Sequence, residues 1–251
     1  MDVNNEMIPA SEYIEAMKGL GFERVVGVQG TSYVDNSMVV IMPTRGMIHW
    51  KVKHSHESIV WPMNQRRACF PCVGEEVGKA YNLMIQGILA NPELSKWKYV
   101  LTLEDDNVQP PDVVLKLIES IESSGGLDAV SGIYFTKGDL NMPMAYGDPE
   151  AYRKTGVLDF RPRDIRSALL KGQLIEVNGI AMGCSLYRMQ MFKDIQPPWF
   201  VTVNEWDPQK GTACYTQDLS FCEKAKKAGK RFAVDCRVKV GHVDVNTGVI
   251  Y

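Results

Sequence analysis

The chain has 251 residues, of which 45% are hydrophobic and 23% charged, and 28 basic against 30 acidic side chains give a formal net charge of -2. This composition is typical of a globular protein long enough to bury one sizeable core. The charge balance excludes a strong overall positive field toward nucleic acid or anionic lipid. No apolar run reaches the roughly 18 residues that span a bilayer, and residues 1–6 lack the basic start of a secretory signal. We therefore expect a cytoplasmic protein with no integral membrane segment.

The six cysteines are Cys69, Cys72, Cys184, Cys214, Cys222 and Cys236. Cys69 and Cys72 have the spacing of half a zinc site or of a redox pair, but no second Cys-x-x-Cys completes a zinc cage. Their segment is apolar and strand-like. We expect reduced thiols that pack as small hydrophobic side chains.

Strand-like and helix-like segments alternate along the chain, which favours a largely parallel sheet with helices on both faces. Strands are expected at residues 25–28, 38–42, 99–103, 129–135, 231–235 and 238–240. Helices are expected at residues 76–89, from 110–112 to the Gly125-Gly126 pair, and at 218–228. Residues 137–175 are rich in turn signals, and no segment reads as an interdomain linker.

The acidic segment Glu104-Asp105-Asp106-Asn107 directly follows the predicted strand 99–103. In open parallel sheets, ligands bind beyond the carboxyl ends of the strands. Three consecutive acids repel one another unless something positive lies among them, and Mg²⁺ or Mn²⁺ prefers carboxylate oxygens and water. The alternative is an acidic turn that caps the following helix through Asn107 or Asp112.

Two later residues extend this pattern. Asp218 stands at the start of a predicted helix, where it either complements the helix dipole or acts as a general base. His242 follows the last predicted strand and a glycine. A lone histidine is usually structural or exposed, yet histidine is also a common metal ligand.

In this order the segments resemble the GT-A glycosyltransferases, especially family-2-like inverting enzymes, from about Val39 to Gly248. Residues 40–45 are similar to that family's first strand and nucleotide-base loop, and 78–82 to its Gly-x-Ala-Arg-Asn helix, with Tyr81 in the usual basic position. Residues 103–107 with Pro110-Pro111 resemble the DxD region, here with glutamate as the first acid. Residues 178–188 and 197–200 resemble the acceptor-side segment, and Gln217-Asp218 stands where the family has Glu-Asp.

The resemblance implies an α/β fold, a Rossmann-like three-layer α/β/α sandwich of the GT-A type with a central, mainly parallel mixed sheet. It implies a single domain over residues 1–251. Residues 1–37 would form an N-terminal helix-and-strand extension, 38–135 the nucleotide-sugar-binding half, and 136–251 the acceptor-binding and catalytic half.

The same resemblance implies roles for particular residues. The nucleotide-sugar contacts would be Pro43, Thr44, Arg45, Gly78, Lys79, Asn82, Glu104 and Asp105. The acceptor contacts would be Gly183, Cys184, Trp199, Phe200 and Gln217. Glu104, Asp106 and His242 would hold Mn²⁺ or Mg²⁺, and Asp218 would be the catalytic base.

These residues predict a metal-dependent glycosyltransferase that moves a sugar from a nucleotide-diphosphate sugar to an acceptor hydroxyl with inversion. One alternative is a nucleotidyltransferase that makes nucleotide sugars, but residues 43–49 supply only one Gly and one Arg for a phosphate loop. The other is a non-catalytic nucleotide-sugar-binding module, which Asp218 and His242 disfavour. The acceptor stays open among a glycan, a lipid-linked glycan, a protein and a modified nucleic-acid base.

The remaining aromatic and histidine residues have simpler expected roles. His54 and His56 alternate as on an exposed strand or loop. Trp50, Trp61 and Trp97 are expected in or beside the core. Trp199 and Trp206 are candidates for stacking on a sugar, because they lie in the acceptor-side region.

Overall fold

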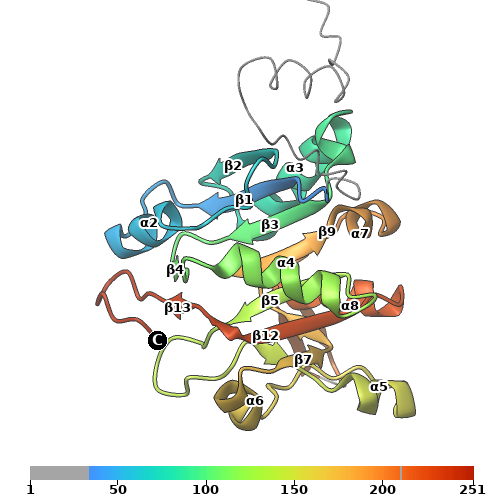
Figure 1. The fold of residues 1–251 in the computed structure, drawn as a ribbon. Coiled ribbons are helices and arrows are strands. Elements are labelled where there is room, and N and C mark those ends of the chain that lie inside the picture. The colour runs from blue at the N-terminus through green and yellow to red at the C-terminus, as the bar shows by residue number, and fades with distance from the viewer. Residues whose placement is uncertain (1–33, 210) are drawn as a thin grey trace, which may run out of the picture. The chain divides into compact units, whose positions relative to one another are not determined.

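The computed structural model describes residues 34–209 and 211–251, and residues Asn36–Tyr251 form one compact unit (Figure 1). The strand predicted at 25–28 lies outside the described residues, as does most of the predicted N-terminal extension. Among the described residues, no helix combines the length and the apolar character needed to cross a membrane.

A seven-stranded sheet in the order β2-β1-β3-β9-β5-β12-β7 forms the centre of this unit. Its strands are β1 (Met38–Thr44), β2 (Arg67–Val73), β3 (Tyr99–Leu103), β5 (Ala129–Ile133), β7 (Leu174–Val177), β9 (Cys184–Arg188) and β12 (Phe232–Lys239). Five strands run in one direction, whereas β9 and β7 run antiparallel to their neighbours. The prediction of a mainly parallel mixed sheet is therefore confirmed.

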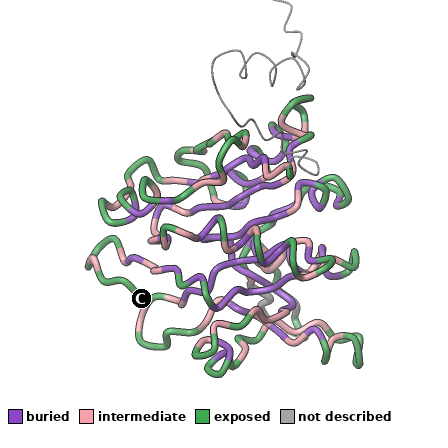
Figure 2. Tube along the Cα trace, in the orientation of Figure 1, coloured by how far each residue is buried: buried purple, intermediate pink, exposed green. Residues whose placement is uncertain are grey.

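Helices cover both faces of the sheet because alternate side chains of each strand point to opposite sides. Val39 and Ile41 of β1 join a core with α3 (Val77–Ala90), α7 (Met189–Asp194) and α8 (Gln217–Lys227). Met38 and Val40 join a second core with α4 (Val113–Ser123). Strands β1, β3, β5, β9 and β12 are buried along most of their length, whereas the edge strands β2 and β7 are more exposed (Figure 2). This is the three-layer α/β/α sandwich that the sequence predicts.

Short paired strands lie outside the main sheet, and one pair positions the site. β4 (Asn107–Val108) pairs with β13 (Gly241–His242), which sets His242 opposite Asn107. The other two pairs are β6 (Ala145–Tyr146) with β8 (Gly179–Ile180), and β10 (Val203–Asp207) with β11 (Gly211–Tyr215). The first pair brings the end of the chain beside the segment that follows β3.

Several element boundaries differ from the sequence predictions. The two strand pieces predicted at 231–235 and 238–240 are the single strand β12, whose register against β5 shifts between Asp235 and Lys239. The region predicted as loops contains α5 (Pro149–Thr155) and α6 (Arg166–Lys171). A 3-10 turn (Leu94–Lys96) precedes β3.

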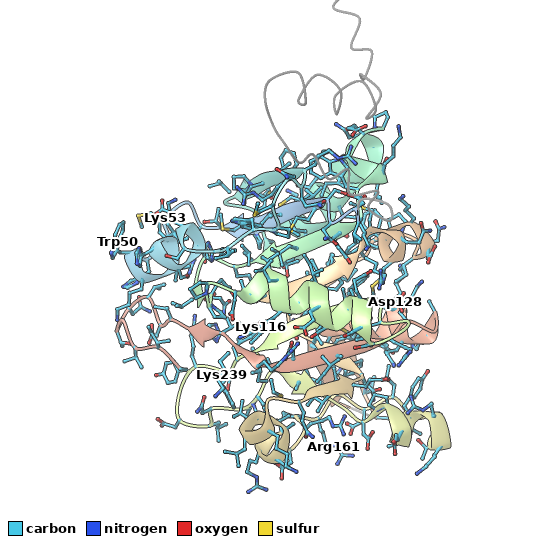
Figure 3. The ribbon with its side chains drawn as sticks, viewed as in Figure 1. Trp50, Lys53, Lys116, Asp128, Arg161 and Lys239 are labelled. Atoms are coloured by element: carbon cyan, nitrogen blue, oxygen red, sulfur yellow. The ribbon has the colours of Figure 1, made fainter. Side chains whose placement is uncertain are left out.

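The expectations for His54, His56 and Trp50 are wrong. These three residues lie on the short helix α2 (Trp50–Glu57), where only Val52 and Ser55 are buried. One short apolar side chain in a polar segment gives too little periodicity to reveal a helix. Trp50 is 70% exposed at the start of this helix rather than in the core (Figure 3). Trp97 is buried and Trp61 is half-buried, as expected.

Candidate active site

The segments that follow β1 and β3 meet the start of α8 in a groove of about 610 Å³. Parallel strands end at the same edge of a sheet, so the turns that follow them gather there. The predicted site residues that line this groove are Pro43, Thr44, Arg45, Glu104, Asp105, Asp106 and Gln217. The structure thus brings together seven of the residues that sequence reasoning assigned to the site, from three distant parts of the chain.

Asp105 fixes the loop that follows β1. Its Oδ2 accepts hydrogen bonds from the Thr44 hydroxyl at 2.9 Å and from the Arg45 backbone N–H at 3.0 Å. Its Oδ1 pairs with the Arg45 guanidinium at 3.0 Å. The Asp105 side chain is only 9% exposed, whereas that of Arg45 is 61% exposed. The carboxylate therefore holds the loop, and the guanidinium remains accessible at the groove.

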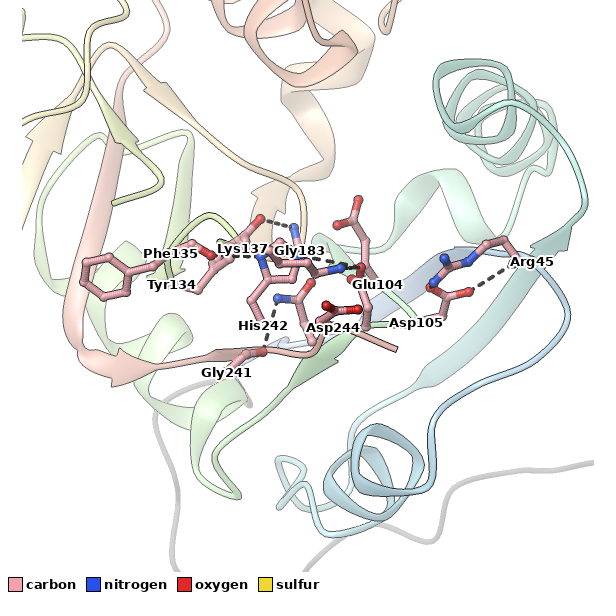
Figure 4. Close-up of polar contacts among 12 residues, drawn as sticks. Arg45, Glu104, Asp105, Tyr134, Phe135, Lys137, Gly183, Gly241, His242 and Asp244 are labelled. Atoms are coloured by element: carbon pink, nitrogen blue, oxygen red, sulfur yellow. Dashed lines mark hydrogen bonds and ion pairs between the residues drawn. The ribbon is translucent and has the colours of Figure 1, made fainter. Parts of the chain in front are cut away.

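Asp106 contacts two basic side chains from other segments, Lys137 and His242, both of which are labelled in Figure 4. Its Oδ2 lies 2.6 Å from the Lys137 ammonium and 3.5 Å from His242 Nε2. Burial alone would raise the pKa of Asp106, but the hydrogen bonds from His242 and Lys137 outweigh it and lower this pKa to about 2. Asp106 is therefore a carboxylate over the whole physiological pH range.

The imidazole of His242 is held in one orientation. Its Nδ1 lies 2.8 Å from the Phe135 carbonyl, and because a carbonyl only accepts, Nδ1 must carry the proton. The ring also makes an edge-on contact with Tyr134. A second proton on Nε2 makes the hydrogen bond to Asp106, whereas the neutral ring presents a lone pair at Nε2 that can bind a cation. Metal-binding histidines are commonly oriented in this way, by donating the other ring N–H to a carbonyl.

The Asp106 and His242 pair fits a divalent cation that also takes ligands from a substrate. Two atoms that each bind one Mg²⁺-sized ion at about 2.1 Å lie about 3 Å apart, close to the 3.5 Å between Oδ2 and Nε2. Within the described part of the chain, no group of three His, Cys, Asp or Glu side chains gathers closely enough to hold a metal alone. Mg²⁺ commonly takes one or two carboxylates and completes its shell with waters and substrate phosphates.

Glu104 turns away from this pair toward helix α3. It accepts a hydrogen bond from the Tyr81 hydroxyl at 2.9 Å. Burial and the neighbouring Asp106 raise the pKa of Glu104 to about 8, with smaller contributions from Asp218 and Asp105. At neutral pH and without a metal, Glu104 is mostly a neutral carboxylic acid. Tyr81 stands where the resembling family has a basic residue. It is fully buried, and its hydroxyl is hydrogen-bonded to Glu104.

Asp218 lies in the first turn of α8, next to the groove-lining Thr216 and Gln217. It is 8% exposed. Its Oδ1 accepts hydrogen bonds from the Thr216 hydroxyl and from the Leu219 N–H at 2.9 Å. Burial raises the pKa of Asp218, although these hydrogen bonds act in the opposite direction. The result is a positioned carboxylate with increased basicity.

The residues predicted at the start of α3 have mainly structural contacts. A Cβ on Gly78 would lie 3.3 Å from Gln217 Cβ and 3.4 Å from the Phe200 carbonyl, so glycine permits close packing against α8. Lys79 pairs with Glu75 at 2.6 Å, and its side chain is 60% exposed.

Asn82 clamps the segment that contains Trp199 and Phe200. Its Oδ1 accepts from both of their backbone N–H groups, at 2.8 and 3.2 Å, and its amide donates to the carbonyls of Gly78 and Phe200. Both the oxygen and the nitrogen of the Asn82 amide are engaged in hydrogen bonds within the protein. Asn82 therefore supports the acceptor-side segment, and it lines the pocket that contains Trp199 and Phe200 rather than the groove.

The predicted acceptor residues are more buried than their assignment suggests. Phe200 packs on Tyr81 with ring centroids 5.2 Å apart, and the Trp199 indole donates to the Ile195 carbonyl at 2.8 Å. The Cys184 thiol is fully buried in the α4-side core. A Cβ on Gly183 would lie 2.4 Å from Asn107 Oδ1. Only Gln217 of this group lines the groove, whereas Trp199 and Phe200 line a neighbouring pocket of about 560 Å³.

Sequence reasoning missed two features of the site: the role of Lys137, and the hydrogen bond from Tyr81 to Glu104. Lys137 lies 31 residues after Asp106 in a region read only as loop, and no motif marks it. Tyr81 was visible as an unusual residue in the motif at 78–82, but its partner could not be read from the sequence.

No protein-family model matches the sequence, and a search of curated proteins returned no match. Among solved structures, the chain is similar to A197 from STIV, with a TM-score of 0.56 and 15% identity over 83% of this chain and 86% of that chain. GalNAc-T7, solved with UDP, GalNAc and Mn²⁺, aligns with a TM-score of 0.49 and 10% identity over 84% of this chain and 45% of that chain. This chain therefore spans less than half of GalNAc-T7.

At these identities the likeness establishes the fold and no more. The fold is mixed α/β, with a central seven-stranded, mostly parallel sheet flanked by helices. This arrangement is consistent with the Rossmann-like GT-A fold that the sequence predicts.

The pKa of Glu104 predicts how stability depends on pH. The folded protein holds this proton more tightly than the unfolded chain, whose glutamate titrates near 4.5. The stabilisation is complete below that value and is lost as the pH rises to about 8. In EDTA, Glu104→Gln should therefore melt close to the parent protein at about pH 5, and at least about 2 °C above it at about pH 9.

Thermal unfolding monitored by circular dichroism at both pH values checks this prediction. Glu119→Gln is the control, because that carboxylate is 61% exposed in its pair with Arg237. If the parent and Glu104→Gln proteins melt in parallel across this range, Glu104 does not carry a raised pKa.

Proposed function

We propose that this chain is a glycosyltransferase that moves a sugar from a nucleotide-diphosphate sugar to an acceptor hydroxyl, with a divalent cation and with inversion. The observation that carries the proposal is that the Asp106 carboxylate, which lines the groove together with Gln217, faces the oriented His242 imidazole. The fold supports it, because the groove lies where open parallel sheets bind nucleotides. The base of the nucleotide, the sugar and the acceptor stay open.

Asp106 and His242 would hold Mn²⁺ or Mg²⁺, whereas Glu104, which the sequence also assigned to the metal, faces Tyr81 and forms no close group with them among the described residues. When bound, such a cation neutralises the negative charge that develops on a departing diphosphate. The exposed guanidinium of Arg45 is suited to bind a phosphate oxygen at the same groove. Pro43 and Thr44 would contact the nucleotide from the loop that Asp105 holds.

Asp218 would act as the base for the acceptor hydroxyl. Its raised pKa brings its proton affinity closer to neutral pH, which favours proton transfer in the transition state. The two hydrogen bonds to Oδ1 fix the orientation of the carboxylate. The proton of the hydroxyl passes to Asp218 as the oxygen attacks the anomeric carbon, and one displacement of this kind inverts that carbon.

The two alternative functions fit the site less well. A nucleotidyltransferase needs free donors in the loop after the first strand, but the Thr44 hydroxyl and the Arg45 N–H are already bound to Asp105. A non-catalytic binding module has no need of a buried, oriented carboxylate such as Asp218. A nucleotide-sugar donor fits a cytoplasmic enzyme, and this location remains a prediction.

The cation assignment predicts that activity depends on Asp106. Incubating the protein with a panel of nucleotide sugars and Mn²⁺ should release nucleoside diphosphate, and EDTA should abolish the release. In Asp106→Ala, the affinity for Mn²⁺ should fall by at least about tenfold, because a ligand is lost. Isothermal calorimetry measures this affinity and the panel measures turnover.

Asp112→Ala is the matched control, because Asp112 is an exposed carboxylate near the same segment and its side chain makes no helix-capping bond. It should leave both Mn²⁺ affinity and turnover unchanged. Normal turnover by Asp106→Ala, or by protein freed of metal, would contradict the assignment.

The role of Asp218 predicts a loss of rate without a loss of donor binding. Asp218→Asn keeps the shape and can still accept from Leu219, but it cannot take the acceptor proton. The transfer rate should fall by at least about a hundredfold, while donor and Mn²⁺ affinities stay near the parent values. If Asp218 only complements the helix dipole, stability changes by about 1 kcal/mol or less and transfer persists. Transfer rate, donor affinity and melting temperature of this variant separate the two roles.

A further inference from the structure

The loop that follows β5 presents Lys137 to the site. The Thr136 N–H donates to the Met142 carbonyl at 2.8 Å, and the Met144 N–H donates to the Tyr134 carbonyl at 2.9 Å. The turn between them has positive φ angles at Gly138 and Asn141. These backbone bonds fix the base of the loop, so the position of Lys137 next to Thr136 is defined by the fold.

The same loop organises both basic groups that face Asp106. The Phe135 carbonyl orients His242, and two residues later the Lys137 ammonium contacts Asp106 Oδ2, the oxygen that His242 Nε2 also faces. The Lys137 side chain is 32% exposed, compared with 17% for Asp106. The ammonium can therefore leave through solvent without disturbing the core.

Lys137 and a divalent cation compete for one oxygen. A cation bound at Asp106 Oδ2 would repel an ammonium at contact distance. Lys137 must then move, and its flexible four-carbon stem allows this. A diphosphate that shares the cation with Asp106 would offer the displaced ammonium new negative oxygens at the same place.

We propose that Lys137 occupies the cation position beside Asp106 in the metal-free protein, and that a divalent cation displaces it onto the diphosphate of the donor. This inference rests on the proposed function and assigns a diphosphate-binding residue to it. Cation binding and diphosphate binding are thereby linked through one side chain. Binding of the cation releases the Lys137 ammonium, and the released ammonium binds the diphosphate.

Calorimetry on Lys137→Met tests the exchange, with Mn²⁺ alone and then inorganic pyrophosphate at saturating Mn²⁺ as probes. Without the competing ammonium, Mn²⁺ should bind at least about threefold more tightly than to the parent protein. Pyrophosphate should bind about tenfold more weakly, because a charge-assisted contact is lost. Lys137→Arg keeps the charge and should restore both affinities toward the parent values.

Lys116→Met is the matched control, because Lys116 forms a similar pair with Asp112 at 2.7 Å and is also 32% exposed, on α4 (Figure 3). It should change neither affinity. If the parent protein binds both probes and Lys137→Met binds them equally well, the exchange is wrong and the proposed function stands. If the parent protein binds neither probe, the metal site and the exchange both fail. Weaker Mn²⁺ binding by Lys137→Met would also overturn the exchange.

Discussion

Three consecutive carboxylates follow the buried strand β3, and their mutual repulsion is the constraint around which this part of the structure is organised. Each carboxylate has a different partner. Asp105 is neutralised by Arg45 from the loop after β1. Glu104 keeps its proton and accepts from Tyr81 of α3. Asp106 remains charged and is balanced by Lys137 and His242.

These contacts also explain why distant segments meet at this edge of the sheet. The Asp105 contacts close the β1 loop, and the pairing of β4 with β13 brings His242 over the segment that follows β3. Asp106 is the member of the triplet whose charge is balanced only by side chains that a cation can displace or join. Asp106 is therefore the carboxylate best suited to bind a cation, whereas Asp105 and Glu104 hold the neighbouring segments through Arg45 and Tyr81.

Much of the fold could be predicted from the sequence because its signals are local. The apolar strand 99–103, the helical spacing in 76–89 and the glycine after α8 each depend on neighbouring residues, and the structure places elements there. The helix α2 could not be predicted, because its burial depends on contacts with β4 rather than on its own periodicity.

The candidate site likewise contains some residues that the sequence reveals and others that it does not. The acidic triplet, Asp218 and His242 are visible as polar residues next to apolar elements, so their meeting at one edge follows from sheet geometry. Lys137 is not visible, because its role depends on the path of a loop. The buried positions of Cys184 and Trp199 could not be read from a motif either, since a motif does not reveal which face of the sheet or core a side chain joins.

The most direct test of the account is the position of a bound cation. Crystals grown with Mn²⁺ and pyrophosphate should show an anomalous-scattering peak in contact with Asp106 Oδ2 and His242 Nε2, with Lys137 moved from Asp106 to the pyrophosphate. An ordered pyrophosphate in the groove without manganese beside Asp106, or manganese bound only elsewhere while Lys137 still contacts Asp106, would contradict it.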